Sequence, residues 1–341
     1  MPVVVVHRAH RLSSPARSRG HSQGQRGPSC WRPGESLVFP DPWDPAVIAN
    51  FTGRIRSSCN RTRPYAANLL GTIWTDTPAF DIRQAQAETG RDWVSTLRCR
   101  PTATPGRMQY AAFLARRYGA DPAKVCAAYD APARNCSSWA AMDLCGVRNV
   151  AVPTAMTDDY DFLPQVVEQY YRVGTAAFRG CDPAGLLFGD TILTPWTPDA
   201  VIKVIAGFVD VISYQPNTAA YNATEMERVH RLAGGKPMLI ADIGFGFPHS
   251  PPYNRTEWQM YRSQADAGAA YRGFLLSSVR SGYVIALNKC EYIDRAVIQP
   301  TRTLKPGTLD FDGTEHAVLT AAIKAANAAA QQLAAAAVSP A

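Results

Sequence analysis

The sequence predicts an α/β protein with a parallel sheet, and three observations support this fold class. Short apolar runs alternate with longer segments of helical spacing, which is the order of β/α units with right-handed crossovers. Several of the apolar runs end on polar or acidic residues. Neither GxGxxG nor GxxxxGK follows any of them, which weighs against a nucleotide-binding fold. A (β/α)8 barrel, whose site draws on the ends of many strands, fits these observations best.

Residues 1–36 are predicted to be a disordered basic extension, rich in Arg, Ser, Gly and Pro. Residues 1–34 carry six arginines and no acidic residue, so the rest of the chain holds only +1 of the net charge of +7. A near-neutral body with a basic tail lacks the electrostatic footprint of a nucleic-acid-binding protein. The Arg- and Ser-rich composition is also found in transit peptides.

The folded region is predicted to span residues 37–330, with an Ala-rich tail at 331–341. With 341 residues, of which 46% are hydrophobic, the chain is long enough to bury a large core. No apolar run approaches the length that spans a bilayer. Apolar residues spaced i, i+3, i+4 or a Pro near a helix start predict the helices. They are expected at 45–58, 106–118, 121–129, 161–179, 199–207, 224–232 and 259–279, with a last one from 317 onward.

Five strands are expected between these helices. The clearest is 236–245, where Pro237 precedes an apolar run that stops at Asp242 and a Gly-aromatic loop. Such a run is typical of a buried parallel strand that delivers one acid to the edge of a sheet. A lone Asp after a strand more often caps a turn. The same pattern at other strand ends favours a functional site. The remaining strands are expected at 68–78, 186–190, 209–214 and 283–288.

Eight stretches occur in a recognisable order: LLGTIWTDTPAFD, GRDWVSTLR, PGRMQYAAFLARRYG, CDPAGLLFGD, VDVISYQPN, KPMLIADIGFG, GYVIALNKCEYIDR and KPGTLDFDG. This succession resembles glycoside hydrolases of the agarase and β-galactosidase type, which are retaining (β/α)8 enzymes, and the resemblance covers roughly residues 38–330. It implies that strand 68–78 is the fourth strand and supplies the general acid/base. It also implies that strand 236–245 is the seventh strand and supplies the nucleophile.

The sequence departs from this family at both catalytic positions. The nucleophile position falls on Asp242, where the family usually has Glu, which is one methylene longer. The family's Asn-Glu pair aligns with Asp76 and Thr77, so the usual acid position is Thr and the carboxylate lies one residue earlier. Three further β/α units of roughly 30 residues each would not fit before residue 68. The N-terminal part of the barrel is therefore expected to be incomplete or replaced.

Retaining hydrolysis requires two carboxyl groups about 5–5.5 Å apart on either side of the scissile bond. We predict Asp242 as the nucleophile and Asp76 as the acid/base, with Asp190 as its substitute. A helix or turn cap is an equally good interpretation of Asp190. Glu291 and Asp294 lie on the last loop, where an ion pair of Asp294 with Arg295 is the more ordinary interpretation.

Polar and aromatic residues near the strand ends are candidates for substrate binding. Aromatic rings stack on sugars, and amide, hydroxyl and amine groups hydrogen-bond to sugar hydroxyls. Each of these residues is also compatible with core packing or solvent exposure. The candidates are Trp74, Thr77, Trp196, Tyr214, Gln215, Asn288, Lys289 and Tyr292.

No metal or other cofactor is expected, because the six histidines show no HExxH or similar ligand spacing. A Ser-His-Asp triad is not expected either, since GxSxG is absent. Eight cysteines permit disulfides, and Cys126, Cys136 and Cys145 are close enough to pair locally. Together with several Asn-x-Ser/Thr triplets, they favour a secreted or organellar setting. Oligomeric state is not indicated.

Two functions are compatible with this sequence. The first is a glycosidase that cleaves a galactan-like or agarose-like polysaccharide by a retaining mechanism. The alternative is a catalytically inactive carbohydrate-binding barrel that has lost its acid/base. Thr77 at the usual acid position keeps this alternative open. Both predict a poly- or oligosaccharide ligand, but only the first predicts hydrolysis.

Overall fold

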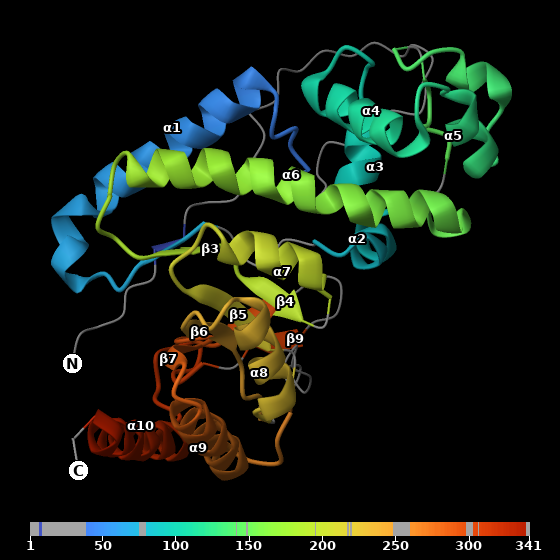
Figure 1. Cartoon of the computed structure of the whole chain (residues 1–341). Coiled ribbons are helices and arrows are strands. Elements are labelled where there is room, and N and C mark those ends of the chain that lie inside the picture. The colour runs from blue at the N-terminus through green and yellow to red at the C-terminus, as the bar shows by residue number, and fades with distance from the viewer. Residues whose placement is uncertain are drawn as a thin grey trace. The chain divides into compact units, whose positions relative to one another are not determined.

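The computed structural model describes residues 7–8, 39–74, 80–140, 142–147, 149–194, 196–216, 218, 220–247, 260–297, 303–305 and 307–338. The chain folds into two compact units (Figure 1). Unit 1 comprises Met1–Asp190 and Pro195–Val209, and unit 2 comprises Thr191–Thr194 and Asp210–Ala341. Each unit contains its own parallel sheet.

Unit 1 is mainly helical. Its longest helix, α6, packs against α1, α3 and α7 (Figure 1). A small parallel sheet has the strand order β1-β2-β3. The elements are β1 (His7–Arg8), α1 (Pro45–Thr62), η1 (Arg63–Asn68), β2 (Thr72–Ile73), α2 (Ile82–Thr89), α3 (Trp93–Arg98), α4 (Pro105–Tyr118), α5 (Ala123–Ala128), η2 (Ala133–Cys136), η3 (Asn149–Ala151), α6 (Pro153–Arg179), β3 (Leu187–Gly189) and α7 (Asp199–Ala206).

Side-chain caps explain where several of these helices begin. Asp44 accepts a hydrogen bond from the Ala46 amide at 2.8 Å, and Pro45 occupies the first helical position of α1. Asp92 and Ser95 form a reciprocal capping box at the start of α3. Gly90 ends α2 with a φ of 74°, a left-handed conformation that glycine adopts without strain.

An aromatic cluster forms the core of unit 1 between α1, β2 and α6. The ring of Trp74 lies 5.1 Å from Tyr171 and 5.8 Å from Phe51, measured between centroids. Phe51 also stacks on Tyr170 at 4.8 Å. Gly174 on α6 allows the indole to approach, because a Cβ at this position would lie 2.5 Å from an atom of Trp74.

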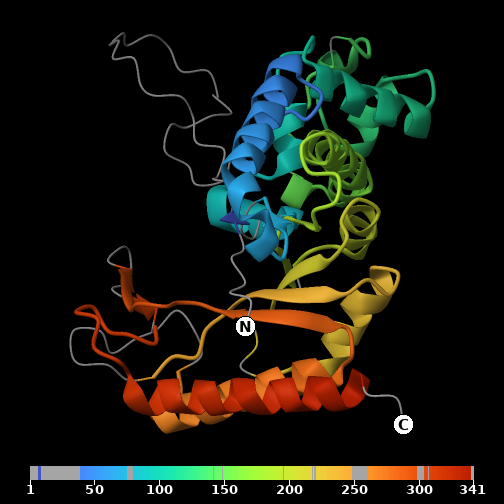
Figure 2. The same cartoon turned by 90° about the vertical axis from the view of Figure 1, so that its left-hand side faces the viewer.

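The described part of unit 2 contains a four-stranded parallel sheet, an antiparallel pair of strands and three helices. The strand order is β4-β5-β6-β7, and α10 lies alongside α9 (Figure 2). All six residues of β6 are buried, as expected for a central strand covered on both faces. The elements are β4 (Ile192–Thr194), β5 (Ile212–Pro216), α8 (Ala223–Leu232), β6 (Met238–Ile243), α9 (Gln264–Arg280), β7 (Val284–Lys289), α10 (Ala317–Val338) and an antiparallel pair, β8 (Arg295–Val297) with β9 (Thr303–Lys305).

The predicted α/β class with parallel strands is confirmed, but the described strands form separate sheets and do not close into a barrel. The break between the two parallel sheets follows Gly189, the last residue of β3, whose backbone has a φ of 67°. The chain then starts β4 only three residues later, so β3 pairs with β2 whereas β4 pairs with β5. Sequence analysis predicted one strand over 186–190 and did not predict β4.

The longer helices and strands β5, β6 and β7 agree with the predictions to within a few residues, except that α6 begins at Pro153 rather than near 161. Helices α2 and α3 were not predicted. The strand expected over 68–78 is limited to Thr72–Ile73 in the described residues, which stop at Trp74 before resuming at Phe80. Helix α10 continues past residue 330, where the Ala-rich tail was expected to begin.

Three disulfides tie unit 1 together, joining Cys59 to Cys181, Cys99 to Cys145 and Cys126 to Cys136. The prediction of local pairing is confirmed for Cys126 with Cys136. It is wrong for Cys145, whose partner lies at the end of α3. None of the helices in the described part of the chain has the length and hydrophobicity of a membrane span.

Two glycines in helices provide a matched test of the aromatic core. Replacing a helical Gly by Ala usually stabilises a helix by roughly 0.5–1 kcal/mol. Gly53 has open space where a Cβ would be placed, so Gly53→Ala should raise the Tm of unit 1. At Gly174 the new methyl would collide with Trp74, and overpacking of this kind costs about 1–3 kcal/mol. Gly174→Ala should therefore lower the Tm in thermal unfolding, and an increase equal to that of Gly53→Ala would contradict this packing.

Candidate functional site

Asp242 lies near the C-terminal end of β6, one of the two central strands of the unit 2 sheet. Its side chain is 4% exposed, and its neighbours Ala241 and Ile243 are also buried. A carboxylate in such a strand needs nearby polar or charged groups, because burying an uncompensated charge is costly. The end of β7 supplies them.

Strand β7 brings three polar residues beside the end of β6. Lys289 is the register partner of Ile243. The Asn288 side-chain amide donates to the Ala241 carbonyl at 3.1 Å, and the Cys290 amide donates to the Ile243 carbonyl at 3.0 Å. The Lys289 ammonium donates to the Glu291 carbonyl at 3.1 Å. These bonds hold the β7 end against the segment that carries Asp242.

The pairing of β6 with β7 is irregular at the carboxylate. Ile240 pairs with Leu287 and Ile243 pairs with Lys289, so β6 advances by one more residue than β7 across this interval. An extra residue in one strand is a β-bulge, and bulges redirect the side chains that they contain. Asp242 is within the interval, so its backbone lies in the irregular part of the pairing.

The electrostatics of this cluster couple three side chains. Burial lowers the pKa of Lys289 to about 8, and nearby groups that include Cys290, Asp294 and Asp242 partly oppose this shift. Burial raises the pKa of the Cys290 thiol well above its usual range, and the charge of Asp242 adds to the effect. At neutral pH the cluster therefore contains a cationic Lys289 and a neutral thiol beside Asp242.

Cys290 is the member of this cluster that sequence analysis considered only as a possible disulfide partner. It is a free thiol in the structure. Its position directly after Lys289 at a strand end was the available signal, since adjacent residues at a strand's C-terminal end reach the same edge of a sheet.

The other substrate-binding candidates of unit 2 differ in exposure. Tyr214 on β5 pairs with Ile240 and is 2% exposed, whereas Tyr292 after β7 is 71% exposed. Gln215 is half-buried, and its Oε1 atom has no hydrogen-bond partner within the described ranges. Tyr292 is therefore accessible to a ligand, and the Oε1 atom of Gln215 can accept a hydrogen bond. Their roles in binding stay predictions.

Asp190 and Trp74 belong to unit 1, where both are buried in the aromatic core. Asp190 is 1% exposed, accepts a hydrogen bond from the Tyr170 hydroxyl at 3.4 Å, and donates its own amide to the Tyr171 hydroxyl at 3.0 Å. Trp74 is 2% exposed. Trp196, also in unit 1, is 38% exposed. The packing of Trp74 is that of a core side chain, and its predicted contact with sugar stays a prediction.

Asp76 and Thr77 lie outside the described residues. The predicted pairing of Asp76 with Asp242 therefore stays a prediction, as does the role of Asp190 as a substitute.

The ion pair of Asp294 with Arg295 stays a prediction, because the Arg295 side chain lies outside the described part of the chain. Asp294 pairs with a histidine. Its carboxylate lies 3.0 Å from Nε2 of His316 and accepts the Gly307 amide at 2.5 Å. Phe247 contacts the same imidazole edge to face, with centroids 4.9 Å apart. These contacts fasten the loop after β7 to the start of α10. Within the described residues, no group of three or more His, Cys, Asp or Glu side chains is placed to hold a metal ion.

No protein-family model matches the chain, and no curated protein matches it. Solved structures do match. An exo-β-agarase aligns with a TM-score of 0.73 and 22% identity over 86% of this chain and 39% of its own. A second agarase aligns with a TM-score of 0.71 and 17% identity over 86% of this chain and 41% of its own. A β-galactosidase from Marinomonas ef1 aligns with a TM-score of 0.55 and 11% identity over 86% of this chain and 45% of its own.

The chain is thus similar in fold to agarases and a β-galactosidase, as the resemblance of its motifs implied. It spans less than half the length of each of these structures, between 39% and 45%. At identities of 22% and below, the likeness concerns the fold.

The pKa of Lys289 provides a test of the Asp242 cluster. The folded pKa of about 8 lies below the usual 10.5. The neutral amine therefore favours the folded state above pH 10.5, and this contribution is lost as the pH falls through 8. Acylation of Lys289, followed by mass spectrometry, should be half-maximal near pH 8 in the folded protein and near pH 10.5 in the unfolded chain.

Asp242→Asn should lower the midpoint for Lys289 further, because the charge of Asp242 raises the pKa of this amine. Asp266→Asn, the same change in the first turn of α9, is the matched control and should leave the Lys289 midpoint unchanged. Equal midpoints in the folded and unfolded protein would show that Lys289 is not buried beside these groups.

Proposed function

We propose that this chain carries the nucleophile of a retaining glycoside hydrolase that acts on a galactan-like polysaccharide. The observation that carries the proposal is a buried carboxylate, Asp242, near the C-terminal end of a central parallel strand, with Lys289 and Cys290 beside it. The fold likeness to agarases supports the substrate class. A (β/α)8 barrel is proposed as the fold, because the strand ends of such a barrel form its site.

In the proposed reaction the Asp242 carboxylate attacks the anomeric carbon as the glycosidic C–O bond breaks. Asp76 donates a proton to the departing oxygen, and a covalent glycosyl-enzyme remains. Asp76 then removes a proton from water, which attacks the same carbon and releases the sugar with Asp242 restored. Lys289 compensates the negative charge of Asp242 while the carboxylate is free, before the attack and after the sugar leaves, and the neutral thiol of Cys290 adds no second negative charge.

The chain is proposed to work in an oxidising compartment, outside the cytosol. Three disulfides link segments within unit 1. Disulfides persist in secreted and organellar settings and are rare in the cytosol. A polysaccharide substrate is consistent with secretion, because polymers of this kind lie outside the cell.

Asp242→Asn tests the nucleophile. The amide cannot attack the anomeric carbon, so hydrolysis of p-nitrophenyl β-galactoside and of agaro-oligosaccharides should fall at least about a thousandfold in kcat. In Asp242→Gly, added azide should restore turnover and give a glycosyl azide of inverted configuration, because a small nucleophile takes the place of the missing carboxylate. Asp266→Asn, an exposed change of the same chemistry, should retain full activity.

Activity that persists in Asp242→Asn would overturn the proposed role. An inactive wild type that still binds agaro-oligosaccharides would indicate a non-catalytic carbohydrate-binding protein instead.

Asp76→Asn tests the acid/base. A good leaving group such as 2,4-dinitrophenolate departs without protonation, whereas a sugar hydroxyl requires a proton. The variant should therefore form the glycosyl-enzyme normally from the dinitrophenyl galactoside but lose cleavage of agaro-oligosaccharides. Burst kinetics separate the two steps. An equal loss on both substrates would assign Asp76 a structural role, and Asp190→Asn should then be tested in the same way.

A further inference from the structure

The loop that follows β7 turns inward at Asp294, a residue without a role in the proposed reaction. Tyr292 and Ile293, just before it, are 71% and 47% exposed, whereas Asp294 is 5% exposed. Its Oδ1 atom accepts the Gly307 amide at 2.5 Å, and its Oδ2 atom lies 3.0 Å from Nε2 of His316. A buried carboxylate is costly unless such partners hold it, so these contacts fix Asp294 in place.

The segment 307–309 holds this loop and His316 together through backbone bonds. The Thr308 amide donates to the Tyr292 carbonyl at 2.8 Å, and the Thr308 carbonyl accepts the His316 amide at 2.9 Å. A Cβ on Gly307 would lie 2.6 Å from the same Tyr292 carbonyl oxygen, so the absence of a side chain allows the two backbones to approach this closely. The contact between Asp294 and the imidazole is therefore built into the backbone around it.

The hydrogen bonds around His316 assign the position of its ring proton. The Leu319 amide donates to Oε1 of Gln264 at 3.3 Å, which leaves the Nε2 group of Gln264 facing Nδ1 of His316 at 3.5 Å. A side-chain amide nitrogen is a donor, so Nδ1 accepts and the ring proton lies on Nε2. His316 is therefore a neutral imidazole in this arrangement, and it donates to Asp294, which accepts as a carboxylate.

The charge of Asp294 acts on Lys289, the amine beside the proposed nucleophile. Burial lowers the pKa of Lys289 to about 8. The groups that oppose this shift are, in decreasing order, Cys290, Asp294, Glu291 and Asp242. The effect of Asp294 thus exceeds that of Asp242 itself. Without Asp294 the amine would lose its proton at a lower pH, and the nucleophile would lose the cation that compensates it.

We propose that His316 is a positioning residue of the proposed hydrolase site. Its neutral imidazole holds Asp294 as a carboxylate, and the charge of Asp294 keeps the Lys289 amine protonated. This role rests on the hydrolase function proposed above. The alternative is a purely structural role, in which the imidazole only packs against Phe247, 4.9 Å away between ring centroids. The first role requires a hydrogen-bond donor at this position, and the second requires a ring.

Two substitutions of His316 separate the donor from the ring. In His316→Gln the side-chain amide nitrogen takes the place of Nε2 as a donor to Asp294, but the ring is lost. In His316→Phe the ring is kept, but the donor is lost. With p-nitrophenyl β-galactoside, His316→Phe should lower kcat at least about tenfold, because small displacements of groups around a reacting centre are costly. His316→Gln should retain most of the wild-type kcat.

His230 provides the matched control. Its imidazole also makes a hydrogen bond, to the Lys236 carbonyl at 3.0 Å, and also packs on an aromatic ring, that of Tyr283 at 4.1 Å. Lys236 and Tyr283 precede β6 and β7, so His230 lies at the opposite end of the sheet from Asp242. His230→Phe and His230→Gln should leave kcat unchanged. Equal losses at the two histidines, or a greater loss in His316→Gln than in His316→Phe, would overturn the proposal.

Nitrogen NMR of the imidazoles tests the network without relying on activity. In protein labelled with 15N-histidine at pH 7.5, the signal that disappears in His316→Gln should show a protonated Nε2 and an unprotonated Nδ1. A proton on Nδ1 would overturn the assignment of His316 as the donor to Asp294, and the proposal with it.

Acylation of Lys289 tests the last link of the chain. Asp294→Asn should lower its midpoint below pH 8, because the change removes a negative charge that raises the pKa of the amine. Asp266→Asn should leave the midpoint unchanged. An unchanged midpoint in Asp294→Asn would contradict the proposal. An inactive wild type would overturn the hydrolase function, whereas the NMR and acylation results would still decide whether His316 and Asp294 set the charge of Lys289. The two failures are therefore distinguishable.

Discussion

The burial of β6 on both faces is the constraint from which the candidate site of unit 2 follows. A strand of this kind is otherwise apolar, and Asp242 is the charged residue that it contains. An isolated buried charge is costly, so polar or charged groups have to lie near the Asp242 carboxylate. In a buried strand these groups come from the neighbouring strands of the sheet. The pairing of β6 with β7 determines which residues lie there. It brings Lys289 and Cys290 beside the Asp242 segment although they lie far from it in sequence.

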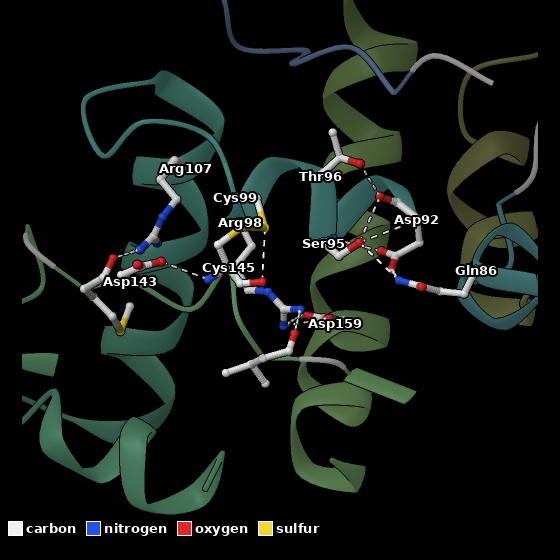
Figure 3. Close-up of a disulfide and its surroundings, with 12 residues drawn as sticks. Gln86, Asp92, Ser95, Thr96, Arg98, Cys99, Arg107, Asp143, Cys145 and Asp159 are labelled. Atoms are coloured by element: carbon white, nitrogen blue, oxygen red, sulfur yellow. Dashed lines mark hydrogen bonds and ion pairs between the residues drawn. A yellow bond between two sulfur atoms is a disulfide. The ribbon is translucent and has the colours of Figure 1, made fainter. Parts of the chain in front are cut away.

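The same rule governs the helical unit. Asp158 and Asp159 of α6 are fully buried, and their carboxylates are held by phenols and arginines from other helices. Tyr110 donates to Asp159 at 2.7 Å, and Tyr129 donates to Asp158 at 2.8 Å. Burial raises the pKa of Asp159 to about 6, even against the charge of Arg98. The bonds of this network therefore tie α6 to α3 and α4 inside the unit, and Figure 3 shows the pair of Arg98 with Asp159.

The sequence predicts the parts of this fold whose causes are local. Pro45 after Asp44, and the apolar run that stops at Asp242, depend on neighbouring residues, and both elements are found where expected. Features that depend on distant partners could not be predicted in this way. Cys145 has a nearby candidate in Cys136, yet its actual partner, Cys99, becomes adjacent only once α3 has formed and packed. Asp294 likewise pairs with His316, a contact that exists only because α10 begins beside this histidine.

The pairing of β6 with β7 is irregular twice, and the two irregularities are opposite. Between Met238 and Leu239 the extra residue belongs to β7, and between Ile240 and Ile243 it belongs to β6. The two strands therefore regain their first register at Ile243, and each bends locally where it carries the extra residue. Asp242 lies in the second irregular interval, so its surroundings depend on the partner strand as well as on its own segment of sequence.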